Sequence, residues 1–258
     1  MADDQYDELY ARRAARTETS NAAPLLRSLC GDDWLWETGA TNWITRTELS
    51  RIPSELGIGA GATFVDLGCG NGTPGLWIAE QTGARVIGID RSQAGCEVAR
   101  KRAQAKHPGV DAEYRAADMT STGLPDASVD AVLSIDAVQI MKPRLAAFSE
   151  AARILRPYGR FVLTTWDSPG DVTAEALMPD REIVADSRPL LEESGFRVRV
   201  QERIPSWPSR AHATYRTILE QRDELAPVVG PALIREAEWG AAHAHRSVHV
   251  FFVCERAP

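Results

Sequence analysis

Short apolar runs alternate with amphipathic stretches along the middle of this chain of 258 residues. Six runs predict strands near residues 63–68, 85–90, 111–117, 129–135, 159–166 and 196–203. Because helical patterns separate the runs, we expect the strands to lie parallel with right-handed crossovers. A seventh run, 248–254, is apolar enough to be a buried last strand. The pattern predicts an α/β fold with a doubly wound, mostly parallel sheet of seven strands.

Helical patterns flank this alternation on both sides. Ahead of the first strand they cover residues 6–16, 23–29 and 42–56. After the sixth strand they cover 211–222 and 231–242, and we expect Pro205, Trp207 and Pro208 to interrupt the chain before them. The prediction is one structural domain in four parts: an N-terminal helical segment 1–62, a core 63–203, a helical cap 204–246 and the last core strand 247–258.

The first predicted strand ends at an acid and opens into three glycines. The stretch reads Thr63-Phe64-Val65-Asp66-Leu67-Gly68-Cys69-Gly70-Asn71-Gly72. Glycines at this spacing let a backbone pass close under a ligand with torsion angles that other residues resist. Thr73 and Pro74 suit the N-cap and first turn of a helix whose amides point back at that ligand. We therefore expect a cofactor-binding turn, although any tight strand-to-helix turn can carry glycines.

A second acid strengthens this interpretation. Asp90 ends the next strand, one strand-helix-strand crossover after Asp66, so it should lie beside the glycine turn. An acid there can accept hydrogen bonds from both hydroxyls of a ribose. The spacing Gly-x-Gly-x-Gly is not the dinucleotide pattern Gly-x-Gly-x-x-Gly, which favours a cofactor without a pyrophosphate.

Asp66 to Gly72, with Asp90, resembles the first motifs of the class I S-adenosylmethionine-dependent methyltransferases. The resemblance continues in 116–119, in the loop 124–134 and in 152–163, where Tyr158 stands in place of the usual glycine. It covers roughly residues 63–200. It implies a Rossmann-like sheet whose last strand enters antiparallel beside the sixth, with S-adenosyl-L-methionine as cofactor and S-adenosyl-L-homocysteine as product.

The resemblance also implies site residues. The cofactor-binding residues it implies are Asp66, Gly68, Cys69, Gly70, Asn71, Gly72, Asp90, Arg91, Asp118, Met119 and Ser134. For Asp66 we expect a role in organising the turn's amides and the cofactor's ammonium group, not in acid catalysis. The alternatives are a helix cap for Asp90 and a surface acid for Asp118. Aromatic candidates for acceptor binding are Trp36, Trp166, Trp207, Tyr215 and Trp239, with core packing as the alternative for each.

The chemistry determines whether a base is needed. A sulfonium methyl is already activated, so alignment with the acceptor and exclusion of water are the main demands. A neutral amine loses its proton during or after attack, whereas a hydroxyl or carbon acid needs a general base. The candidates are His212, His243, His245 and Asp136, with a surface or core position as the alternative for each histidine. His249, close to two of them, invites a metal site, but no carboxylate lies at ligand spacing, so no metal is expected.

Composition limits the partners. A net charge of −7 argues against a nucleic-acid partner, and Arg100-Lys101-Arg102 is interpreted as a solvated helix face. The four cysteines are far apart, which favours buried free thiols. No apolar run reaches the roughly 18–20 residues that span a bilayer, and acidic residues follow Met1, so no membrane partner and a cytoplasmic location are expected. A homodimer is left open.

These observations predict a methyltransferase for a small molecule, of the kind found in bacterial natural product biosynthesis, acting on O, N or C. The alternative is a homologue that binds the cofactor without methylating, such as a cyclase or a regulatory module. Methylation of macromolecular amide or adenine nitrogens is disfavoured. Its Asn or Asp followed by Pro-Pro and an aromatic is absent, because Ser134-Ile135-Asp136-Ala137 occupies that place.

Overall fold

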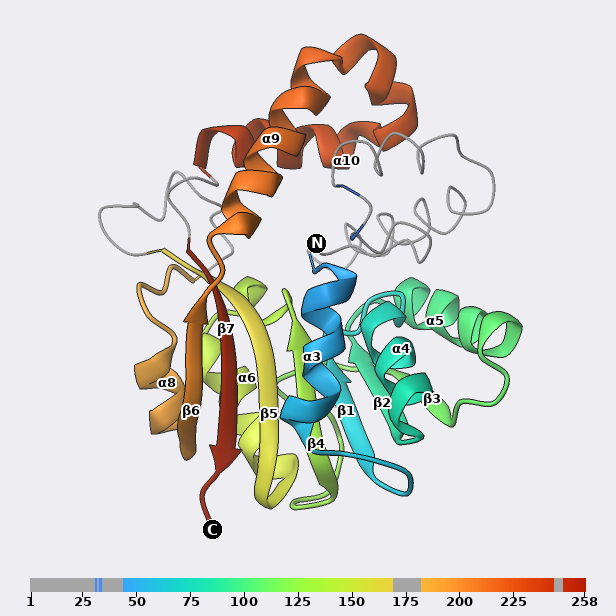
Figure 1. Ribbon diagram of the computed structural model, residues 1–258, viewed down its shortest axis with the longest axis vertical. Coiled ribbons are helices and arrows are strands. Elements are labelled where there is room, and N and C mark those ends of the chain that lie inside the picture. The colour runs from blue at the N-terminus through green and yellow to red at the C-terminus, as the bar shows by residue number, and fades with distance from the viewer. Residues whose placement is uncertain (1–30, 32, 34–43, 169–181, 244–247) are drawn as a thin grey trace.

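The structure is a computed structural model that describes residues 31, 33, 44–168, 182–243 and 248–258 (Figure 1). Within these residues lies a seven-stranded sheet in the order β3-β2-β1-β4-β5-β7-β6. The strands are β1 (Thr63–Leu67), β2 (Arg85–Asp90), β3 (Ala112–Ala116), β4 (Val129–Ile135), β5 (Leu155–Asp167), β6 (Phe196–Arg203) and β7 (Val248–Arg256). Pairing is parallel except that β7 runs antiparallel to both β5 and β6. The predicted doubly wound, mostly parallel sheet is confirmed.

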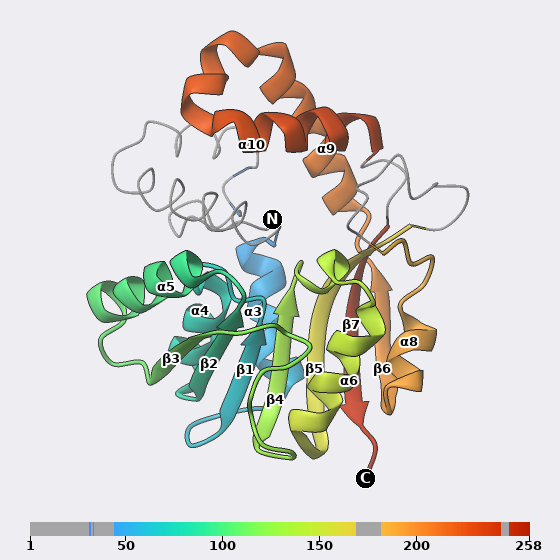
Figure 2. The same ribbon diagram turned by 180° about the vertical axis from the view of Figure 1, so that it is seen from behind.

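Helices cover both faces of the sheet (Figures 1 and 2). On one face lie α3 (Arg46–Leu56) and α4 (Thr73–Thr82), which contribute Leu49, Ile52 and Ile78 to an apolar cluster. On the other face lie α6 (Arg144–Ile154) and α8 (Arg188–Glu193). Strand β7 serves both layers, because Phe251 packs into the first cluster and Phe252 into the second. This alternation is expected of a strand buried on both faces.

The helix expected at 42–56 is present as α3 but begins at Arg46, and its ends show why it forms there. Thr45 and Glu48 make a reciprocal capping box at the start, and Gly57 ends the helix with a φ of 67°. The two helices expected earlier, at 6–16 and 23–29, lie outside the described residues.

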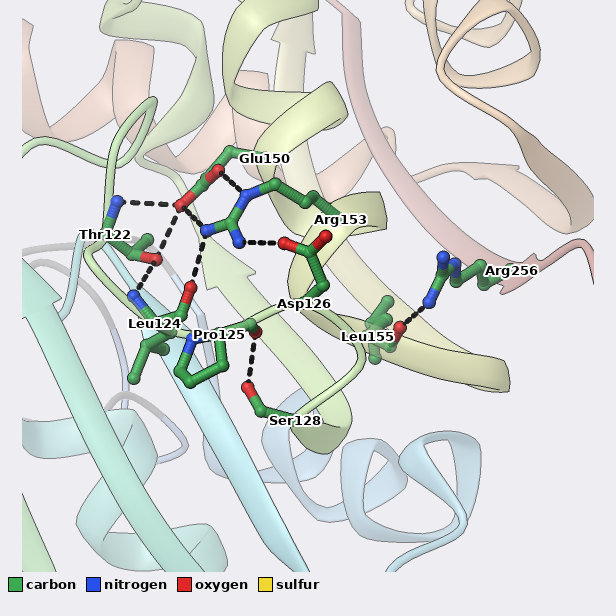
Figure 3. Close-up of polar contacts among 9 residues, drawn as sticks. All are labelled: Thr122, Leu124, Pro125, Asp126, Ser128, Glu150, Arg153, Leu155 and Arg256. Carbon is green, nitrogen blue, oxygen red and sulfur yellow. Dashed lines mark hydrogen bonds and ion pairs between the residues drawn. The ribbon is translucent and has the colours of Figure 1, made fainter.

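The connection from β3 to β4 contains no helix and is held in place by Arg153 of α6 (Figure 3). Arg153 donates to Glu150 at 2.7 Å, to Asp126 at 2.6 Å and to the Leu124 carbonyl at 2.8 Å. Glu150 in turn accepts hydrogen bonds from the amide and hydroxyl of Thr122. These bonds fix the segment that leads into β4, whose far end carries part of the site.

Strand β5 begins at Leu155, earlier than the expected residue 159, because a bulge lengthens it. The register against β4 shifts between Val129 and Ala131, and Tyr158 in the bulge has a φ of 65°. A left-handed φ favours glycine, which explains why glycine is usual at this position. Tyr158 adopts the same conformation at a cost in strain. The Tyr158 ring is 65% exposed, so packing does not compensate for that strain.

Two cap helices, α9 (Ser206–Glu220) and α10 (Arg222–His243), lie between β6 and β7 in sequence and beyond the carboxyl ends of the parallel strands (Figures 1 and 2). The expected interruption at Trp207-Pro208 is wrong. Pro205 is the N-cap residue of α9, and Pro208 lies in its first turn, where a missing amide breaks no helical hydrogen bond. Helix α10 begins before residue 231 and includes Pro227 and Pro231.

The two cap helices share a small core of their own. Ala211, Tyr215, Ile218, Leu225 and Ile234 are buried in it. Tyr215 lies so close to α10 that a Cβ on Gly240 would come within 2.2 Å of its ring. Among the described residues, no helix is long and apolar enough to cross a membrane.

Candidate cofactor and acceptor site

The glycine turn has the backbone that its sequence predicts. Gly68, Gly70 and Gly72 have φ values of 77°, 53° and 79°, all in the left-handed region. Space is also restricted, because a Cβ on Gly68 would lie 2.2 Å from Ala137 Cβ. Gly72 is the N-cap of α4, so the expectation that Thr73 takes this position is wrong; Thr73 is the first helical residue.

Asp90 ties the turn to β2. Its Oδ2 accepts a hydrogen bond from the Gly70 amide at 2.8 Å, and its Oδ1 accepts one from the Ser92 amide at 2.9 Å. The carboxylate is buried at the end of β2, beside the turn, as the crossover length predicts. A carboxylate at this place, the end of a strand beside the glycine turn, is where the ribose-binding acid is expected. That role remains a prediction.

Asp66 is the buried acid of the turn. Its Oδ2 is buried without a hydrogen-bond partner among the described residues, and a Cβ on Gly75 would lie 2.7 Å from that oxygen. Burial, followed by the negative charge of Asp90, raises the pKa of Asp66 to about 7, against a smaller opposing effect of the Gly75 amide. A buried acceptor oxygen with no donor suits a cationic ligand group. The turn therefore fits a cofactor that brings an ammonium group.

Arg102 supports the turn, a role the sequence analysis missed. Its Nη1 donates to the Asn71 carbonyl at 2.9 Å and to Thr73 Oγ1 at 2.5 Å. The interpretation of Arg100-Lys101-Arg102 as a solvated face is wrong for both arginines, since Arg100 donates to the Tyr114 carbonyl at 2.6 Å. The available signal was helical spacing on α5 (Gln93–Lys106), because Arg102 follows the buried Ala99 by three residues.

The remaining predicted cofactor residues lie near the turn in different settings. Asp118 is exposed and accepts from the amide and hydroxyl of Thr120. Met119 is buried, and its Cε would lie 3.2 Å from a Cβ on Gly68. The Ser134 hydroxyl donates to the Leu67 carbonyl at 2.8 Å, which joins β4 to β1. These placements are compatible with the predicted roles, which stay predictions.

Cys69 and Arg91 complete the set. Cys69 is buried in a cluster with Cys96, Ala99 and Tyr114, and with Cys254 these two cysteines are free thiols. Burial raises the pKa of the Cys69 thiol, which suits a packing role. Arg91 is half-buried directly after Asp90.

A second group of polar residues lies at the carboxyl end of β4. Asp136 has a φ of 51°, and its amide donates to the carbonyl and the hydroxyl of Thr164. The Thr164 hydroxyl donates to Asp136 Oδ1 at 3.1 Å, and His249 Nε2 lies 2.8 Å from the same oxygen. The His249 ring is buried against the edge of Trp166, with ring centroids 5.1 Å apart. Asp136, a predicted base candidate, is thus paired with a histidine that the sequence analysis considered only as a metal ligand.

A cavity of about 780 Å³ opens beside this pair, between the end of β6, helix α9 and the start of β7. The residues that matter for its chemistry are Arg203, His212, Arg216, Glu220, Val248 and His249. Because β7 is antiparallel, its first residues lie at the same edge of the sheet as the carboxyl ends of β1 and β4. The cavity and the glycine turn therefore share one edge.

The other predicted acceptor and base residues fall into three groups. His212 lines the cavity, and Trp166 packs against both the sheet and the cap. Tyr215 is buried in the cap core and Trp239 is half-buried on α10. Trp36 and His245, and the side chains of Trp207 and His243, lie outside the described residues. Within the described part of the chain, no group of three or more His, Cys, Asp or Glu is placed to hold a metal ion.

A doubly wound sheet with a glycine turn and a neighbouring acid defines an α/β protein that binds a nucleoside-containing cofactor. The family profile described as "Methyltransferase domain" matches residues 65–163. A relative from Mycolicibacterium smegmatis described as "Probable S-adenosylmethionine-dependent methyltransferase" is 33% identical over 189 residues, covering 70% of each chain. The chain belongs to the S-adenosylmethionine-dependent methyltransferases, and the cofactor of this family is S-adenosylmethionine.

Two further known proteins are similar to this chain. The 27-O-demethylrifamycin SV methyltransferase of Amycolatopsis mediterranei is 32% identical over 162 residues, which is 60% of this chain and 60% of that protein. The chain thus matches about three fifths of that relative's length. The crystal structure of the [4+2]-cyclase SpnF superposes with a TM-score of 0.73 and 20% identity, covering 92% of this chain and 93% of that one. At this identity the likeness concerns the fold.

Proposed function

We propose that this protein transfers the methyl group of S-adenosylmethionine to a small organic acceptor. One observation carries the proposal: the glycine turn at the end of β1 and the cavity beneath α9 lie at the same edge of the sheet, with Asp136 at the end of the intervening β4. A relative that methylates a demethylrifamycin supports an acceptor from bacterial natural product biosynthesis. The net charge of −7 supports a small molecule over a nucleic acid.

Each part of the site has a role that follows from its position. When bound, the cofactor supplies a methyl group already activated by its sulfonium. The turn and Asp66 hold the amino acid end of the cofactor, and Asp90 holds the ribose. The cap helices exclude water and align the acceptor with the methyl group. Alignment of this kind can lower a barrier by about 7–11 kcal/mol, so little covalent machinery is required.

Calorimetric titration of cofactor-free protein with S-adenosylmethionine and S-adenosylhomocysteine tests the binding half of the proposal. We expect micromolar affinity for both ligands. Asp90→Ala should weaken binding by about 1–3 kcal/mol, because a buried ribose loses its partner. The matched control is Asp111→Ala, because Asp111 is an exposed acid just before the amino end of β3. Folded protein that binds neither ligand would contradict the proposal.

The transfer half needs an acceptor panel. Protein and S-adenosylmethionine are incubated with small hydroxyl, amine and thiol compounds on shared skeletons, and S-adenosylhomocysteine release is measured with the mass of the methylated product. Release that depends on an acceptor supports methyl transfer. Tight cofactor binding with no release across the panel would instead favour a homologue that binds without methylating.

A further inference from the structure

Asp136, which follows the fourth strand, and His249, which lies on the last strand, meet in the interior. They are separated by 113 positions in sequence, and His249 Nε2 lies 2.8 Å from Asp136 Oδ1. The side chain of His249 is 0% exposed and that of Asp136 is 7% exposed. A buried carboxylate is expensive unless hydrogen-bonded, and burial of both members makes their contact a specific one.

The carboxylate determines which nitrogen of His249 is basic. A carboxylate oxygen only accepts hydrogen bonds, so Nε2 must carry a proton in this contact. In the neutral ring the lone pair then belongs to Nδ1. Thr164 holds the same carboxylate oxygen and the Asp136 amide, so the acid cannot rotate away without losing these bonds. Asp136 fixes both the tautomer and the orientation of the imidazole.

Asp136 occupies an unusual backbone conformation for this task. Its φ of 51° is left-handed, a region that few residues other than glycine adopt. The turn places the carboxylate toward β5 and β7, where Thr164 and His249 lie. Conformations of this kind concentrate at functional sites, where surrounding bonds hold them in place.

The pair bridges the two halves of the site. Ala137, the next residue after Asp136, lies close to the cofactor turn. A Cβ on Gly68 would be 2.2 Å from the Cβ of Ala137. On the other side, His249 lines the cavity beneath α9. The pair therefore links the segment that packs on the cofactor turn to the cavity available to an acceptor.

We infer that His249 is the catalytic base of an O-methyl transfer, with Asp136 as its positioning residue, and that the acceptor is a hydroxyl compound. This inference rests on the proposed function. The hydroxyl proton passes to His249 Nδ1 and the acceptor oxygen forms the new O–CH₃ bond. The C–S bond breaks with its electron pair remaining on sulfur. The positive charge of the sulfonium is thereby exchanged for that of an imidazolium, which the Asp136 carboxylate stabilises.

The first test measures His249 itself, without cofactor or acceptor. ¹⁵N-histidine NMR of the full chain, with the His249 signals assigned by their absence in His249→Gln, reports which ring nitrogen carries the proton. We expect the Nε2–H tautomer in the neutral ring. In Asp136→Asn the preference for this tautomer should weaken, because the carboxylate that favours a proton on Nε2 is gone. An Nδ1–H tautomer, or an unchanged tautomer population in Asp136→Asn, would overturn the inference.

The second test measures turnover with a phenol and its matching aniline as acceptors. His249→Gln keeps a donor for Asp136 but removes the base, so methylation of the phenol should fall roughly 10²- to 10⁴-fold. Cofactor affinity and melting temperature should change little. The control is His107→Gln, because His107 at the end of α5 pairs with Glu80 of α4 and is not among the residues that line the cavity, so turnover should be unchanged. Wild-type turnover of the phenol by His249→Gln would overturn the inference.

The pH profile separates His249 from its neighbours. Arg203, His212, Arg216 and Glu220 line the same cavity, and Asp136 is the acid in direct contact. The inflection in kcat/KM for the phenol should disappear in His249→Gln and persist in His212→Gln. If the inflection disappears in His212→Gln and persists in His249→Gln, the base is His212 and the inference is wrong.

Failure of the inference and failure of the proposed function give different results. If no acceptor is methylated, the proposed function fails, and the NMR spectra still decide whether Asp136 sets the tautomer of His249. If only the aniline is methylated, methyl transfer stands and the assignment of a hydroxyl acceptor is overturned. If Gln at position 249 prevents folding, Asp136→Asn provides both the NMR and the kinetic readouts.

Discussion

The cofactor side and the acceptor side of this site are assembled from different lengths of chain. On the cofactor side, Asp90 bonds the Gly70 amide across 20 residues, within one strand-helix-strand unit. On the acceptor side, Asp136 meets His249 across 113 residues, from β4 to the last strand. The first contact repeats a local motif, whereas the second exists because β7 inserts between β5 and β6.

This difference explains the different constraints on the two sides. The cofactor turn depends on backbone torsions and on space, both of which few sequences satisfy. The acceptor side depends on side-chain chemistry around a cavity, which many sequences could line. Changes to the turn should therefore act through stability and cofactor affinity, and changes around the cavity through turnover and acceptor choice. Four predictions test this comparison.

The largest effect is expected from Gly68→Ala. The new Cβ would meet Ala137 at 2.2 Å in a backbone with a φ of 77°, so strain and overpacking should together cost roughly 2–5 kcal/mol of stability and abolish cofactor binding. Gly61→Ala is the matched control, because Gly61 has a φ of 86° and open space around it. It should cost only about 1–2 kcal/mol and leave binding intact. Equal losses in urea unfolding and calorimetry would contradict the role of close packing at the turn.

A smaller effect should come from the pH dependence of Asp66. An ordinary aspartate has a pKa near 3.9 in the unfolded chain, while the folded value is about 7. Between these values the folded protein retains a proton that the unfolded chain has released. The stabilising contribution is present below the unfolded pKa and is lost as the pH rises through the folded pKa. From pH 5 to pH 8 the cofactor-free protein should lose about 2–3 kcal/mol from this group.

Urea unfolding of wild type and Asp66→Asn at both pH values measures this contribution. The difference in unfolding free energy between the two proteins should change by that amount, since asparagine does not titrate. The ammonium of a bound cofactor favours the ionised acid, so binding at pH 6 should release a proton, which calorimetry in two buffers detects. A pH-independent difference between the variants would show that Asp66 titrates normally.

A third, weaker effect is expected from Arg102→Met. Methionine keeps much of the side-chain length but removes the hydrogen bonds to Asn71 and Thr73 that hold the turn. Cofactor affinity should fall about tenfold, in line with about 1–1.5 kcal/mol for hydrogen bonds of this kind. Lys101→Met, on the exposed face of the same helix, is the control and should bind normally. Equal affinity in both variants would remove Arg102 from the site.

The smallest effect is expected at Tyr158, far from both halves of the site. Tyr158→Gly should raise stability by roughly 0.5–1 kcal/mol, because the left-handed backbone no longer strains a Cβ while the unfolded chain gains some freedom. Tyr158→Ala is the matched control, which loses the ring but keeps the strain. If alanine stabilises the protein as much as glycine does, the strain argument fails at this position.

The sequence allowed the sheet and most of the turn to be predicted from particular residues. The positions of Asp66 and Asp90 near the ends of β1 and β2 follow from two apolar runs separated by one crossover. The three glycines of the turn have the positive φ values that favour glycine. One error in the cap came from a proline. Pro208 suggested a break, yet it lies in the first turn of α9, where a missing amide breaks no helical hydrogen bond.

The sequence by itself determined the side of the site that recognises the cofactor, because torsion angles and strand ends depend on residues that are adjacent in the chain. Only the tertiary structure decided the partners of side chains from separate elements. Arg102 of α5 reaches the turn that precedes α4, and His249 meets Asp136 because an antiparallel last strand brings it to the end of β4. The physical reason is that such contacts depend on strand order and side-chain direction, which no local pattern of apolar and polar residues specifies.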